Sequence, residues 1–180
     1  LKLQENEKEQ EKELLDLPVL VVDDDKTCCE STVATLQEIG IAGEWVLTGK
    51  EAVERCAARH KTGRDYFAVI LDWKMPEMDG LTMLEQMKNE LANSRVIFIT
   101  AYDKIEYAAK AIRLSAFDFL MKPVKNEDLI QSLDRAVQSM DRENSKIEKQ
   151  AKEQTILRRA RFLSALTAGS MEDIAHAFSG

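Results

Sequence analysis

The stretch Val-Leu-Val-Val-Asp-Asp-Asp, residues 19–25, decides the fold of this chain. Its apolar residues are mostly β-branched and follow one another without a polar interruption, which is typical of a strand buried on both faces. A strand of that kind belongs in a parallel sheet, because crossover helices cover both faces of such a sheet. Acidic residues follow at once, so the same stretch predicts several carboxylates at the carboxyl end of a buried strand.

The alternation of strand and helix continues along the chain from this first strand. Further strands are predicted over 42–47, 67–71, 96–99 and 116–121, and helices over 27–39, 49–60, 80–92 and 105–114. Short connections and right-handed crossovers place such strands in one parallel sheet. We therefore predict an α/β fold with a doubly wound, five-stranded, flavodoxin-like sheet of order 2-1-3-4-5.

Polar residues stand at the ends of predicted strands 1, 3, 4 and 5. They are Asp23 and Asp24, Asp72, Thr100 and Lys122. Taken singly, an acid in such a place is most often a helix N-cap, and a lone threonine or lysine is most often a solvated surface residue. Because parallel strands end at the same edge of the sheet, however, the topology gathers all of these residues into one crevice.

The residue types in this crevice are those that phosphoryl transfer needs. Neighbouring carboxylates without histidine or cysteine indicate Mg2+, a hard cation that prefers oxygen ligands. A carboxylate such as that of Asp72 can attack phosphorus and form an acyl phosphate. Catalysis of that step is mainly positioning and neutralisation of charge on the phosphoryl oxygens. Mg2+, the ammonium group of Lys122 and the hydroxyl of Thr100 would each contact one of the three phosphoryl oxygens.

The chain resembles the receiver domain of bacterial response regulators over about residues 18–138. The segments that carry the resemblance are 19–25, Asp-Trp-Lys-Met-Pro-Glu-Met-Asp-Gly at 72–80, Ile-Thr-Ala-Tyr at 99–102 and Ala-Phe-Asp-Phe-Leu-Met-Lys-Pro at 116–123. The resemblance implies a phosphoacceptor that takes its phosphoryl group from a histidine kinase in a two-component phosphorelay. It also implies that the protein is no enzyme beyond transferring and hydrolysing its own phosphoryl group.

The resemblance also assigns roles to single residues. It implies that Asp72 is the phosphoacceptor and that Lys122 contacts the phosphoryl group. It implies a Mg2+ site with Asp24 as a direct ligand, Asp23 through water, and Asp72 and the backbone carbonyl of Lys74 as further ligands. Thr100 and Phe119 are the expected switch residues, although core packing alone would also explain Phe119. A cis peptide before Pro123 is expected as well.

Two residues beside the expected phosphoacceptor suggest control over its hydrolysis. Trp73 follows Asp72 directly, and Lys74 is a long cation at the mouth of the predicted crevice. Tyr102 lies near the opposite lip. Our hypothesis is that these three side chains shield or steer attacking water and so set the lifetime of the phosphoryl group.

The two ends of the chain differ from its centre. Residues 1–17 are rich in charge and predict a helical leader or linker. Residues 139–180 predict a helical linker that leads towards an output domain and resembles the linker of AraC-type response regulators. Two helix-turn-helix units need far more chain than remains in this region, so we expect the DNA-binding part to be missing. Heptad positions run through the linker region, with a residues Ile130, Val137, Asn144 and Ala151 and d residues Leu133, Met140, Ile147 and Gln154.

This heptad pattern indicates a coiled coil that joins two copies of the chain, with Asn144 fixing the register. One long exposed helix remains the alternative. Basic residues Arg158, Arg159 and Arg161 follow, and three arginines on a helix more often form a solvated face than a nucleic-acid site.

Composition excludes several other classes. A net charge of -7 argues against nucleic-acid contact in this part of the protein. No apolar run approaches the ~20 residues of a membrane span, and three cysteines without metal-binding spacing fit a reducing cytoplasm. The most probable class is a response regulator, as a fragment of a transcriptional regulator. The alternatives are a receiver from a hybrid histidine kinase and a constitutive dimerisation module that is not phosphorylated.

Overall fold

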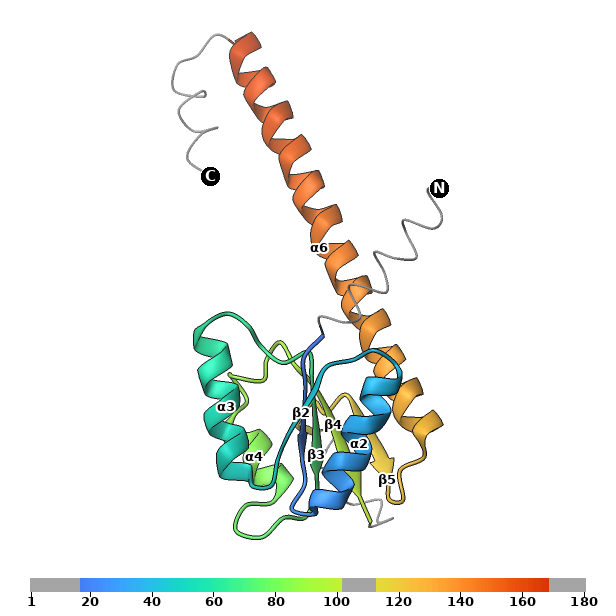
Figure 1. Ribbon diagram of the computed structural model, residues 1–180. Helices are drawn as coiled ribbons and strands as arrows, with labels where there is room; N and C mark the ends of the chain where they lie inside the picture. Colours follow the sequence, from blue (N-terminus) through green and yellow to red (C-terminus); the bar gives the residue numbers. More distant parts are fainter. Residues whose placement is uncertain (1–16, 102–112, 169–180) are drawn as a thin grey trace. The chain divides into compact units, whose positions relative to one another are not determined.

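The computed structural model describes residues 17–101 and 113–168 of the chain (Figure 1). Most of the predicted helix at 105–114, and residues 1–16 of the predicted leader at 1–17, lie outside these residues. Within them, the chain forms two compact units divided between Ala136 and Val137. The first unit contains the sheet and all the predicted site residues that the structure describes.

The predicted sheet is confirmed in strand number, direction and order. All five strands are parallel in the order β2-β1-β3-β4-β5. Their bounds are β1 Val19–Val22, β2 Gly43–Val46, β3 Ala68–Asp72, β4 Arg95–Thr100 and β5 Asp118–Met121. The central strands β1 and β3 are buried along their whole length, as their unbroken apolar sequences predict.

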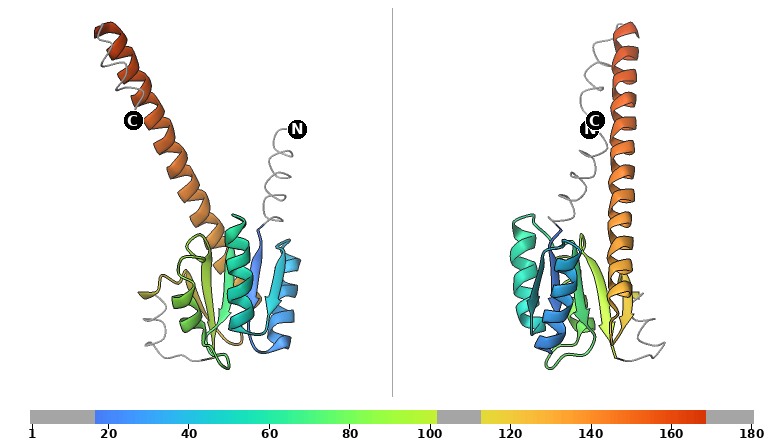
Figure 2. Two further views of the ribbon diagram at one scale, coloured as in Figure 1. Left: turned by 90° about the vertical axis from the view of Figure 1, so that its left-hand side faces the viewer. Right: turned by 45° about the vertical axis from the view of Figure 1, so that its right-hand side comes forward.

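Helices cover both faces of this sheet. Helices α3 (Gly49–Lys61) and α4 (Gly80–Gln86) lie on one face, and α2 (Lys26–Glu38) and the first turns of α6 (Asn126–Ala168) lie on the other (Figures 1 and 2). Across the second face, the hydroxyl of Thr35 donates to Asn126 Oδ1 over 3.1 Å. Two layers of helix therefore enclose one layer of sheet, and the strand ends remain accessible at the edge.

Side-chain caps explain where the three shorter helices begin. Asp25, Thr48 and Asp79 each accept hydrogen bonds from the backbone N–H groups of the first turn that follows them. One predicted end was wrong, because α4 stops at Gln86 rather than near residue 92. The chain continues there as hydrogen-bonded turns, in which the polar run 88–90 includes an asparagine of low helix propensity.

The long helix α6 has a different environment in each unit. Its first turns bury Leu129, Leu133 and Ala136 completely or nearly so. Beyond residue 136 Val137 and Met140 are partly buried, and four large apolar side chains are exposed, namely Ile147, Ile156, Leu157 and Leu163. No helix among residues 17–101 and 113–168 is long and apolar enough to span a membrane.

Candidate functional site: an acidic crevice at the strand ends

The carboxyl ends of four parallel strands meet as the sequence predicts. Asp72 ends β3 and is in register with Ile99 of β4, and Thr100 ends β4 in register with Met121 of β5. Backbone bonds hold the segments that leave these strands: Trp73 N donates to Ile99 O over 2.8 Å, and Lys122 N donates to Thr100 O over 2.7 Å. These backbone hydrogen bonds therefore fix the ends of β3, β4 and β5 relative to one another beside the site.

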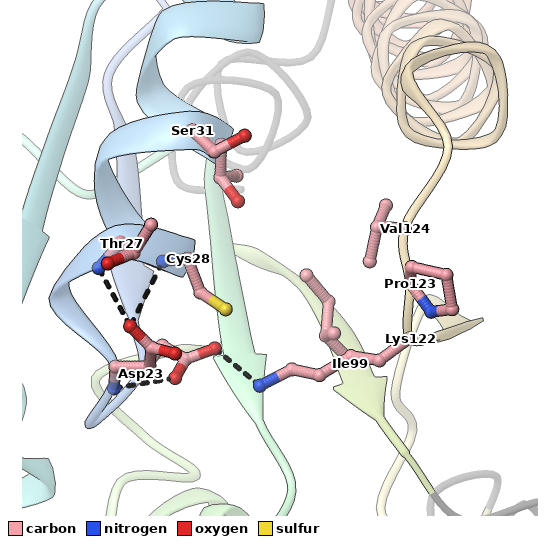
Figure 3. Close-up of a pocket in the computed structure, with 10 residues that line it drawn as sticks. Asp23, Thr27, Cys28, Ser31, Ile99, Lys122, Pro123 and Val124 are labelled. Atoms are coloured by element: carbon pink, nitrogen blue, oxygen red, sulfur yellow. Dashed lines mark hydrogen bonds and ion pairs between the residues drawn. The ribbon is translucent and has the colours of Figure 1, made fainter.

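Lys122 joins two of the three carboxylates. Its Nζ lies 2.7 Å from Asp23 Oδ2 and 2.9 Å from Asp72 Oδ1. Figure 3 shows the Lys122 side chain reaching across from the segment after β5 to Asp23. Asp23 and Asp72 are only 4% and 6% exposed, so both ion pairs are shielded from water. The shorter of these two ion pairs thus joins residues 99 positions apart in the chain.

The electrostatics of the crevice favour a cation. Burial raises the pKa of Asp72; the Lys122 ammonium partly offsets this rise, and the negative charge of Asp23 adds to it. Burial alone would lower the pKa of Lys122, but its bonds to Asp23 and Asp72 outweigh burial and raise it. Lys122 is therefore firmly charged, yet one ammonium does not balance three neighbouring acids.

The donor set fits Mg2+. Carboxylate oxygens of Asp23, Asp24 and Asp72 lie within 4.8 Å of one another, and Asp24 is exposed to solvent. An all-oxygen set with an open side suits a hard cation that keeps several waters. The N–H of Lys74 donates to Asp72 Oδ2 over 3.2 Å, which draws the Lys74 backbone to the same place. The role of the Lys74 carbonyl as a ligand stays a prediction.

The run Asp23-Asp24-Asp25 divides between two tasks. The Asp25 carboxylate accepts from the N–H groups of Thr27 and Cys28 and so caps α2. The bond from the Thr27 N–H is the main cause that lowers the pKa of Asp25. The N-cap alternative is therefore true of Asp25, whereas Asp23 and Asp24 belong to the carboxylate cluster.

The expected switch residues lie on neighbouring strands. Thr100 is fully buried at the end of β4. Phe119 of β5 is partly buried and packs against the hydrophobic core. Its ring meets that of Trp73 edge-on, with centroids 6.3 Å apart. An aromatic contact thus connects β5 with the residue that directly follows Asp72.

Trp73 does not lie at a lip of the crevice, and the hypothesis that it helps to control hydrolysis stays a prediction. Its side chain is buried rather than placed at the mouth of the crevice, and its ring also packs against Phe98 with centroids 5.0 Å apart. The large indole finds more apolar contact in the core than at the surface. Lys74 is exposed, as predicted, whereas Tyr102 lies outside the described residues.

One residue of the site was missed as such by sequence reasoning. Gly80 was interpreted only as a helix-start signal, but a Cβ at this position would lie 2.5 Å from the backbone oxygen of Asp72. The Gly80 N–H also donates to Trp73 O over 3.0 Å. Only glycine permits this close approach, which closes the loop that carries Lys74. The Asp-Gly pair at 79–80 was the one signal for it.

A cavity of about 570 Å³ opens beside Lys122. Figure 3 shows Thr27, Cys28 and Ser31 of α2 on one wall and Pro123 and Val124 on the other. Burial raises the pKa of the Cys28 thiol, so this side chain is a poor nucleophile. The cavity is therefore part of the approach to the crevice rather than a second reactive centre.

Comparisons with known proteins agree with this geometry. A family model for the response regulator receiver domain matches residues 19–134. The regulatory protein AtoC of Escherichia coli (strain K12) is 35% identical over 126 residues, which cover 67% of this chain and 25% of that protein. The transcriptional regulatory protein BtsR of the same strain is 36% identical over 131 residues, covering 71% of this chain and 51% of BtsR. The chain thus matches about a quarter to half of these relatives.

Solved structures show the same fold. The receiver domain of the Francisella response regulator 1452 superposes with a TM-score of 0.60 at 28% identity, over 68% of this chain and 98% of that one. A CheY-like receiver domain from Methanospirillum hungatei JF-1 gives a TM-score of 0.62 at 25% identity, over 70% and 97%. The matched region contains every described residue of the crevice. The chain belongs to the response regulator receiver domain family.

Proposed function

We propose that Asp72 accepts a phosphoryl group from a partner histidine kinase, with Mg2+ held by Asp23, Asp24 and Asp72. The observation that carries the proposal is the position of Lys122, whose ammonium lies between the carboxylates of Asp23 and Asp72. A partly buried ammonium in that place can contact the Asp72 carboxylate before transfer and an incoming phosphoryl oxygen after it. The protein has no other enzymatic task in this proposal.

In the transfer step, a carboxylate oxygen of Asp72 attacks the phosphorus of a phosphohistidine. A P–O bond forms and the P–N bond breaks, and the kinase imidazole leaves as a neutral base after taking up a proton. Lys122 holds one phosphoryl oxygen through its ammonium, and the Thr100 hydroxyl donates to another. Asp23, Asp24 and Asp72 would hold Mg2+, which when bound would supply neutralisation of charge on the phosphoryl group.

The buried position of Thr100 suggests how the signal leaves the site. When its hydroxyl moves to a phosphoryl oxygen, it vacates volume at the end of β4. Interiors are closely packed, so Phe119 on the adjacent strand repacks into that volume. The buried ring of Trp73 moves with it, because the two rings are in edge contact.

The output in this proposal is a change in self-association through α6. Leu133, which the heptad pattern places in the seam, is buried in the first unit and does not take part. The seam therefore consists of Val137, Met140, Asn144, Ile147 and Ala151. It ends near Ala151, because Ile156 follows Ile147 by nine residues, and at about 3.6 residues a turn such residues point to opposite sides of a helix.

The relatives favour a transcriptional regulator over the receiver of a hybrid histidine kinase. Both AtoC and BtsR are regulatory proteins by name, and BtsR is a transcriptional one. We propose that this chain is the receiver part of such a regulator and works in the cytoplasm. The resemblance of its linker to those of AraC-type regulators stays a prediction.

The experiment is an intact-mass measurement after incubation with acetyl phosphate, with and without Mg2+. We expect one Mg2+-dependent phosphoryl adduct in the wild type and none in Asp72→Asn. Asp25→Asn is the matched control: it removes a neighbouring acid that caps α2, and asparagine caps equally well, so the adduct should persist. Asp24→Asn should raise the Mg2+ concentration required by about tenfold or more.

A phosphorylated histidine kinase donor forms the second arm of the test. Absence of the adduct with both donors would overturn the phosphoacceptor proposal and favour the constitutive dimerisation module. An adduct that survives in Asp72→Asn would place the chemistry on another residue.

A further inference from the structure

The carboxylate of Asp118 connects the switch strand with the helix that leaves the domain. Asp118 begins β5, one residue before Phe119. Its Oδ2 accepts from the Ser132 hydroxyl over 2.5 Å and pairs with the Arg135 guanidinium, and both partners lie on α6. Its Oδ1 accepts from the N–H of Phe119 over 2.9 Å. One side chain therefore contacts the backbone of the switch residue and two side chains of α6.

The strength of the bonds in this cluster depends on the burial of its residues and on the charge of Asp118. Ser132 is fully buried, Asp118 is partly buried and Arg135 is exposed, so the hydroxyl–carboxylate bond is better shielded from water than the Asp118–Arg135 ion pair. Burial alone would raise the pKa of Asp118, but the bonds from Ser132, the Phe119 N–H and Arg135 outweigh it and lower the pKa. The carboxylate is therefore ionised at neutral pH and bonded through both oxygens.

The cluster is the last link in a continuous path of contacts from the phosphoacceptor. Asp72 is followed by Trp73, whose ring meets Phe119, and Phe119 donates its N–H to Asp118. From Asp118 the path crosses to Ser132 and Arg135, at the rim of the helix face that buries Leu129, Leu133 and Ala136. Such a path couples two sites only if its members change together.

We propose that Asp118, Ser132 and Arg135 form a latch that transmits repacking of Phe119 to the first turns of α6. The latch rests on the proposed phosphorylation of Asp72 and adds the residues that carry its effect out of the domain. When Phe119 changes its position, its N–H moves relative to Asp118. The carboxylate must then either pull α6 with it or release Ser132 and Arg135. These three residues are positioning residues and do not touch the phosphoryl group.

The test is hydrogen–deuterium exchange of residues 126–136 in the full chain, with and without acetyl phosphate and Mg2+. Intact mass is measured on the same samples. In the wild type we expect phosphorylation to change exchange of this segment by about tenfold, the effect of losing or gaining a hydrogen bond to a charged group. The double variant Ser132→Ala/Arg135→Ala should form the same adduct but exchange fast in both states.

Two further variants separate a coupling role from a purely structural one. Arg142→Ala removes an arginine one heptad later on α6 and should behave as the wild type. Arg135→Lys keeps a cation opposite Asp118 and should restore part of the response. A double variant that takes the phosphoryl group and still shows the full change in α6 would overturn the latch alone. A wild type without adduct would overturn the proposed function together with the latch.

Discussion

The two parts of α6 share one sequence pattern but differ in what covers them. Residues 126–136 bury Leu129, Leu133 and Ala136 within their own unit. Residues 137–151 continue the heptad spacing, yet Ile147 is 63% exposed. Heptad spacing therefore marks an apolar helix face without telling which partner covers it. In the first part the partner is the same domain, and in the second we propose a second copy of the chain.

The largest expected effect is on the free energy of unfolding. It comes from truncating an apolar side chain in the first part of α6, in contrast to the same truncation in the second part. Leu133→Ala removes a fully buried side chain and should lower the free energy of unfolding by about 2–5 kcal/mol. Ile147→Ala removes an exposed one and should change it by less than about 0.5 kcal/mol in dilute solution. Urea unfolding at low protein concentration measures both. Equal losses would mean that the second part of α6 is covered within the same chain.

A weaker effect is expected from the polar seam residue Asn144. A buried asparagine at an a position costs stability, so Asn144→Ile should tighten self-association by about tenfold or more. Ile147→Asn should weaken it. Sedimentation equilibrium over a range of protein concentrations gives both constants, with the phosphoryl adduct as a control for an intact crevice. If neither substitution changes the association constant, these residues do not line a seam between copies.

The pH dependence of the first part should reflect Asp118. Because its pKa is lowered from the ordinary 3.8, its contribution to stability is present above about that pH. The contribution is lost as the pH falls through the lower pKa of the folded state. Asp118→Asn should therefore lower stability by about 1 kcal/mol at neutral pH, and the difference from the wild type should shrink in acid. Urea midpoints against pH provide the measurement, and a pH-independent difference would contradict it.

The smallest effect on the free energy of unfolding is expected from removing most of the second part of α6. A chain that ends after Met140 keeps every residue of α6 that the described part of the chain shows as buried. It should retain Mg2+-dependent phosphorylation and stay within about 0.5 kcal/mol of the wild-type stability at low concentration. Self-association should be lost. A truncated chain that no longer takes the phosphoryl group would show that the crevice depends on residues beyond the first unit.

Much of the fold and of the crevice follows from strand patterns and their end residues. Asp23 and Lys122 are far apart in the chain, yet parallel topology alone predicts that they meet, because it fixes which strand ends are neighbours. Side-chain direction is less predictable. Its position directly after the phosphoacceptor suggested that Trp73 takes part in steering water, but it did not reveal that the loop turns its ring into the core. Leu133 was assigned to the seam between two copies because heptad spacing does not tell whether the same domain or a second copy covers an apolar residue.

The close approach at Gly80 has a consequence for how this loop can vary between related chains. Backbone bonds from Trp73 N to Ile99 O and from Gly80 N to Trp73 O close a ring of fixed length behind Asp72. The Lys74 side chain is exposed and can be replaced without breaking these backbone bonds. The number of residues between the two anchors is fixed by the bonds. Evolution can therefore alter the chemistry of this rim by substitution, whereas insertions and deletions there would displace the acceptor itself.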